Sequence, residues 1–126
     1  MEPKIEIGII LSGDDNLVAH LTNIVDHVLH KSSAVYKGVE NLTNLENEKY
    51  FLLLARRNYD LSVVLNDALE LVHPITNELT TFTQEGGEIE INVSILVSGT
   101  MPSINFQPEL LNILGVIGAS IDIDIN

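Results

Sequence analysis

The feature that most limits how this chain can fold is regular alternation between apolar and polar residues. It occupies three segments: Lys4–Leu11, Glu88–Val97 and Ser120–Ile125. Successive side chains of a strand point to opposite faces of its sheet, so alternation predicts strands with one buried face. In the last segment we expect the isoleucines inside and Asp122 and Asp124 outside.

Apolar residues at helical spacing predict helices between these strands. The first helix is expected over Asn16–His30. Proline removes a hydrogen-bond donor, so the second region is predicted as two pieces, Asp60–Val72 and Pro74–Thr83, with a kink between them. Pro108 and Gly118 mark the start and the end of a last short helix.

The remaining segments are shorter and less regular. The apolar run Tyr50–Ala55 predicts a central strand covered on both faces. We expect short strands at Ala34–Lys37 and Ser103–Phe106, the second forming a hairpin with Glu88–Val97. The polar segment Val39–Lys49 is predicted to be a surface loop.

Helices alternating with pairs of strands indicate an α+β fold. We expect a mainly antiparallel sheet with helices packed on one face, a two-layer sandwich. The 126 residues match the size of one domain, so a single domain is predicted over residues 1–126.

The charge is strongly acidic, with 6 Lys and Arg against 18 Asp and Glu and a net charge of −12. Such a chain repels nucleic acid and anionic membranes, so neither is an expected partner. No segment has the signature of a signal peptide or the roughly 18 apolar residues of a membrane span. The absence of cysteine fits a reducing compartment, and a cytoplasmic location is expected.

Several strings are similar to a bacterial family known as domain of unknown function 4279. They are IGIILSGDD near the start, Tyr36–Gly38, the break Leu71–Pro74, and the end from Ile104 to Asn126. Members often carry a Trp where Tyr50 and its neighbour stand here. The resemblance implies a fold without established chemistry. Relatives of such small acidic proteins often occur as immunity proteins of bacterial toxin systems.

Carboxylates recur on the polar side of the alternating segments. They are Glu6, Glu88, Glu90, Asp122 and Asp124. If these strands are neighbours, one sheet face carries a patch of carboxylates. The patch could do acid–base work, hold Mg²⁺ or Ca²⁺, meet a basic partner surface, or simply face solvent. Crowded like charges cost stability, which favours a partner that brings the opposite charge.

Two other groups of residues could carry chemistry. His20, His27 and His30 fall on one side of the first helix, but helical zinc pairs are usually four residues apart. We therefore expect a solvated polar face and no metal site. Arg56-Arg57 is a basic pair that could bind an anion. No nucleophile or cofactor motif is present, and no cofactor is expected.

These observations predict a non-enzymatic protein-binding module. Its most concrete form is an immunity-type inhibitor that occludes the basic active-site surface of a cognate toxin, such as a nuclease. Contacts are expected from Glu88, Glu90, Asp122, Asp124 and Glu6, with residues 39–49 as the alternative. A different class, an enzyme or a domain for a small ligand or metal, stays open, as does a homodimer through an edge strand.

Overall fold

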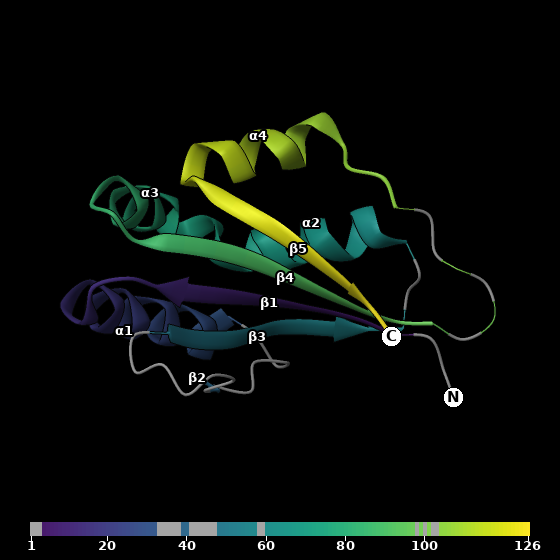
Figure 1. The fold of residues 1–126 in the computed structure, drawn as a ribbon, viewed down its shortest axis with the longest axis horizontal. Coiled ribbons are helices and arrows are strands. Elements are labelled where there is room, and N and C mark those ends of the chain that lie inside the picture. Colours follow the sequence, from purple (N-terminus) through teal and green to yellow (C-terminus); the bar gives the residue numbers. More distant parts are fainter. Residues whose placement is uncertain are drawn as a thin grey trace.

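The alternating segments form neighbouring strands of one sheet, and the helices lie together on one side of it (Figure 1). A computed structural model describes residues 4–32, 39–40, 48–57, 60–97, 99, 101 and 104–126. The strands are β1 (Lys4–Ser12), β2 (Val39–Glu40), β3 (Glu48–Arg56), β4 (Glu88–Leu96) and β5 (Ala119–Ile125). The helices are α1 (Asp15–Ser32), α2 (Leu61–Val72), the short 3₁₀ helix η1 (His73–Ile75), α3 (Thr76–Gln84) and α4 (Pro108–Ile117).

The sheet has the strand order β2-β3-β1-β4-β5. Every pairing is antiparallel except that of β4 with β5, which is parallel. This confirms the predicted α+β fold with a mainly antiparallel sheet and helices on one face. None of the described helices is long and apolar enough to cross a lipid bilayer.

The core lies between the sheet and the helices. Strand β1 buries Ile5, Ile7, Ile9 and Leu11 completely, as its alternation predicts. Apolar side chains of β3, β4 and the helices join them in one cluster. Burial of this apolar surface is the main favourable term in folding, so the alternation determines which sheet face the helices cover.

The helices begin and break where the sequence predicts. The Asp14 carboxylate accepts hydrogen bonds from the first free amides of α1, at 3.0 Å from the Asn16 nitrogen. Asp60 does the same for α2, at 3.1 Å from the Ser62 nitrogen. These caps satisfy amides that have no partner within the helix. Pro74 falls in η1, which separates α2 from α3 and confirms the predicted kink.

The predicted hairpin after β4 is wrong. Residues 104–107 form no strand, and β4 pairs instead with β1 and β5. Helix α4 is the connection between β4 and β5, because parallel strands need a crossover. This crossover lets α4 bury Leu110, Leu114 and Ile117 in the core, which a hairpin would leave without cover.

The loop predicted over Val39–Lys49 is wrong at both ends. Val39 and Glu40 form β2, and Glu48 and Lys49 belong to β3. Val39 and Glu40 pair with β3, and Glu48 and Lys49 pair with β1, a tertiary effect that local polarity does not show. The strand expected at residues 34–37 lies outside the described residues.

The isoleucines of β5 are less buried than expected. Ile121 and Ile123 are half-buried against the core, but Ile125 is 48% exposed, so the prediction that Ile125 lies inside is wrong. Among the described strands, β5 lies at the edge of the sheet and has a neighbour on one side only. Asp122 and Asp124 point outward, as predicted.

Two threonines of α3 tie this helix to the end of α4. The Thr83 hydroxyl lies 2.8 Å from the Ile117 carbonyl oxygen. This is shorter than its distances to the carbonyl oxygens of Leu79 and Thr80 within α3. The Thr80 hydroxyl lies near the Val116 carbonyl oxygen, at 3.4 Å, but is closer to the Thr76 carbonyl oxygen of its own helix, at 2.8 Å. The last carbonyls of a helix have no partner within it, so the Thr83 hydroxyl satisfies a group that would otherwise need water.

Replacing Thr83 by valine should destabilise the protein by about 1 kcal/mol, because the shape is kept while the Ile117 carbonyl loses its donor. Chemical denaturation of the two proteins measures the difference. Thr81→Val is the matched control, since Thr81 is an exposed residue of the same helix. Equal losses in both variants would show that the hydroxyl contact contributes nothing.

Candidate functional site

The sheet face opposite the helices carries the outward carboxylates of β4 and β5. They are Glu88, Glu90, Asp122 and Asp124, as predicted. Glu88, Asp122 and Asp124 are exposed, and Glu90 is partly buried. We call this side the open face.

The strand register brings carboxylates of β3 and β4 to the two sides of β1. Ser12 is paired with Glu48 of β3 and with Glu88 of β4. One step along, Glu90 lies between Ile10 of β1 and Ser120 of β5. The acidic positions of two segments that are separate in the sequence, β3 and β4, therefore meet at one end of the open face.

The remaining predicted carboxylates lie further along the strands. Asp122 is paired with Asn92, one step beyond Glu90. Glu6 and Asp124 lie on either side of Ser94, a further step away. Glu6 forms an ion pair with Lys4 at 2.7 Å. Glu6 is thus compensated locally and separate from the group near Glu90.

We define the acidic patch as Glu48, Glu88, Glu90 and Asp122, with Asp124 extending it along β5. None of these residues takes part in an ion pair within the described part of the chain. The patch therefore presents several negative charges that no ion pair among the described residues neutralises.

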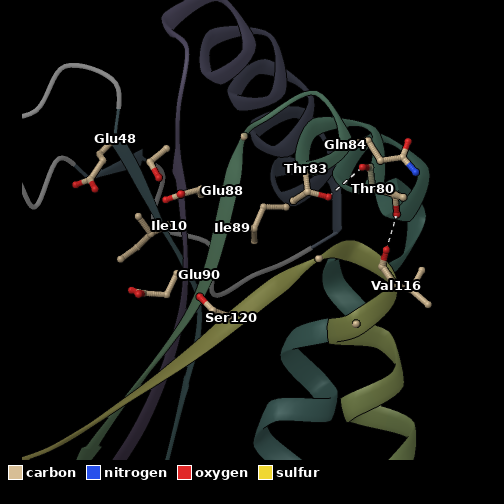
Figure 2. A pocket seen from close by; sticks show the side chains of 14 residues that line it. Ile10, Glu48, Thr80, Thr83, Gln84, Glu88, Ile89, Glu90, Val116 and Ser120 are labelled. Atoms are coloured by element: carbon tan, nitrogen blue, oxygen red, sulfur yellow. Dashed lines mark hydrogen bonds between the residues drawn. The ribbon is translucent and has the colours of Figure 1, made fainter.

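An open depression of about 780 Å³ adjoins the acidic patch where β4 begins (Figure 2). Glu48, Glu88 and Glu90 line one side of it, and Thr80, Thr83 and Gln84 the other. The rest of the wall consists of small or apolar positions from β1, β4, α4 and β5: Ile10, Ser12, Gly87, Ile89, Gly115, Val116, Gly118 and Ser120. Among the described residues that line it there is no Lys, Arg or His.

Backbone dipoles add to the negative potential of this depression. The C-terminal ends of α3 and α4 both contribute to its wall. A helix C-terminus carries a partial negative charge, which favours cations nearby. Carboxylates and helix ends therefore act in the same sense, and the depression is suited to a cationic group.

The pKa of Glu90 is shifted by its surroundings in the acidic patch. Its partial burial, followed by the negative charges of Asp122 and Glu48, raises the pKa of the Glu90 carboxyl above its ordinary value. Each cause disfavours the ionised form. A positive group placed beside Glu90 would reverse that effect, because an opposite charge favours ionisation.

On β3, side chains of the open face are buried and not exposed to solvent. Tyr50 and Leu52 are 8% and 5% exposed, although they lie opposite the main core. The Tyr50 ring lies directly over Gly8, where a methyl group would come within 2.5 Å of the phenolic oxygen. Glycine at this position therefore makes room for the ring.

Sequence reasoning missed Glu48 as a member of the site. It had been assigned to the loop expected over residues 39–49. The signal was available, because extending the period of two backward from Leu52 through Tyr50 reaches Glu48 on the same face. The threonines and Gln84 of the depression had no comparable signal, since only the tertiary fold brings α3 beside β4.

The other candidate groups lie away from this depression. His20 and His27 are exposed on α1, and the side chain of His30 is outside the described residues. Within the described ranges, no three His, Asp or Glu residues form a group that could hold a metal ion. Arg56 and Arg57 are exposed where β3 ends.

Replacing Glu90 by glutamine should raise the thermal midpoint at pH 7 by about 1–2 °C, a small shift because water screens partly exposed charges. The pKa of Glu90 is higher in the folded state than its ordinary value of 4.5. The folded state therefore loses stability as pH rises from 4.5 through the pKa of the folded protein. The gain should therefore vanish below pH 4.5, where both states are protonated. Asp122→Asn should act in the same direction.

Thermal unfolding followed across this pH range tests the prediction. Glu70→Gln is a suitable control, because Glu70 is exposed on α2 and glutamine can still accept from Asn66. A loss of stability in Glu90→Gln at low salt would contradict the account of unneutralised crowding.

Comparison with known proteins identifies a family. No curated protein and no solved structure gives a significant match to this chain. A family model described as Domain of unknown function (DUF4279) matches residues 37–126, which include β2 to β5 and the whole depression wall except the β1 positions. Because this match covers well over half of the sequence, the chain belongs to the family described as domain of unknown function (DUF4279).

Proposed function

We propose that this protein is a non-enzymatic binding module that recognises a basic surface of a partner protein through the acidic patch and its depression. The observation that supports this most directly is the placement of Glu48, Glu88 and Glu90 around a depression to which the described part of the chain contributes no basic residue. In its concrete form the module is a cytoplasmic immunity-type inhibitor that neutralises a bacterial toxin.

Electrostatic complementarity supports the choice of a basic partner. The patch brings like charges together: after the partial burial of Glu90, the negative charges of Asp122 and Glu48 raise the pKa of its carboxyl further. A Lys or Arg side chain entering the depression would meet several carboxylates and two helix C-termini. Such an arrangement increases the rate of encounter as well as specificity.

Inhibition would follow from occlusion. A nuclease-type toxin binds its anionic substrate through Lys and Arg side chains. If those side chains contact Glu88, Glu90 and Asp122, the substrate phosphates lose their binding positions. The inhibitor would need no chemistry of its own, and its negative charge would repel the same RNA or DNA that the toxin attracts.

Removing three charges of the patch, with Glu88→Gln, Glu90→Gln and Asp122→Asn, should weaken partner binding by about tenfold at low salt. The matched control is Glu70→Gln, Glu78→Gln and Glu109→Gln, which changes the net charge equally but on exposed helix positions. Native, patch and control proteins are used as baits in extracts of the host at low ionic strength. A partner is taken as specific when the native and control baits retain it and the patch bait does not.

The purified partner is then tested for inhibition. Its cleavage of RNA and DNA is measured with each of the three proteins, at about 50 mM and about 200 mM salt, since screening weakens interactions between exposed charges. Inhibition by the native and control proteins that declines with salt supports the proposal. Equal binding by patch and control variants, or no protein retained at low salt, would refute it.

A further inference from the structure

Strand β5 forms one edge of the sheet, outermost beside β4 in Figure 1. Within the described part of the chain β5 pairs with β4 alone. The outer side of an edge strand presents a row of backbone N–H and C=O groups that can pair with another strand. This row adjoins the acidic patch, because Asp122 and Asp124 belong to β5.

The backbone hydrogen bonds of Asn126 show which residues of β5 direct their backbone groups outward. The Asn126 amide donates to the Ile95 carbonyl at 2.9 Å, and the Asn126 carbonyl accepts from the Val97 amide at 3.1 Å. Asn126 therefore directs both groups toward β4. Backbone groups alternate in direction along a strand, so Ile121, Ile123 and Ile125 direct theirs away from the sheet.

We propose that the outer edge of β5 accepts an extended segment of the partner as a sixth strand, with Lys or Arg at every second position. The inference rests on the proposed function, because it specifies how the basic partner engages the acidic patch. Addition of a strand to an open edge is a recurrent mode of peptide recognition, in which backbone bonds give affinity and alternate side chains give specificity.

The side chains of β5 determine the pattern of the incoming strand. Asp122 and Asp124 are exposed on the open face, so basic residues on that face of the new strand would lie beside them. On the opposite face, Ile121 and Ile123 are half-buried and Ile125 is 48% exposed, so apolar residues would extend the core there. The expected ligand segment alternates basic and apolar residues.

Charge also excludes a second copy of this chain as the occupant. Two β5 strands paired antiparallel around a two-fold axis would place Asp122 and Asp124 of both copies together on the same sheet face. Like charges opposite each other in a sheet are destabilising, and each chain carries a net charge of −12. A basic strand from a different protein meets none of this repulsion.

The test uses a synthetic peptide as long as β5, in which lysine and valine alternate. Ile123→Pro removes an outward amide and blocks strand addition, while the bonds of β5 to β4 are kept, since proline is tolerated where an edge amide faces solvent. Ile123→Val is the matched control, because its side chain is similar in size to proline and its amide is retained. Calorimetry measures binding, and hydrogen exchange follows the amides of Ile121 and Ile123.

The native protein and Ile123→Val should bind the peptide, and Ile123→Pro should bind about tenfold more weakly. The amides of Ile121 and Ile123 should become protected only in the complex. Should Ile123→Pro fail to fold, Ile125→Pro against Ile125→Val repeats the comparison at the more exposed position. Equal binding by the proline and valine variants overturns the inference.

A second peptide separates this inference from the proposed function. It has the same lysines and valines in two blocks, so its charge is kept and its alternation is lost. Binding of both peptides with equal affinity would overturn strand addition while the acidic patch still recognised positive charge. A dimer of the native protein at neutral pH, abolished by Ile123→Pro, would assign the edge to a second copy and also overturn the inference.

Discussion

One-sided burial of the sheet is the constraint on which the other features depend. The side chains of β1 that face the helices are completely buried, and those of β4 join the same core. Because side chains alternate along a strand, every buried residue places its neighbours on the open face. The carboxylates of Glu88 and Glu90 are therefore exposed on that face as a direct result of burying Ile89 and Ile91.

Much of this arrangement could be predicted from the sequence because it depends on local periodicity. The approximate starts of α1 and α2, the break at Pro74 and the alternation of β1 and β4 all followed from neighbouring residues. Strand pairing did not, because the hydrogen bonds of β4 are equally available to a hairpin and to β5. Glu48 was assigned to a loop for the same reason. It pairs with Ser12 of β1, which is distant in sequence.

The parallel pairing of β4 with β5 has an electrostatic effect that a hairpin would lack. It sets Asp122 one step from Glu90, and the negative charge of Asp122 is the second cause, after burial, of the raised pKa of Glu90. The negative charge of Asp122 on β5 thus acts on Glu90 together with that of Glu48 on β3. Residues far apart in the sequence become coupled through the topology of the sheet.

The end of α4 and the start of β5 supply Gly115, Val116, Gly118 and Ser120 to the wall of the depression. The remaining wall comes from earlier parts of the chain. The cavity therefore exists only while this C-terminal unit is docked through the β4 ladder and the hydroxyls of α3. By mass action, any ligand held there would oppose local opening of the unit, so occupancy and order of the chain's last segment would rise together.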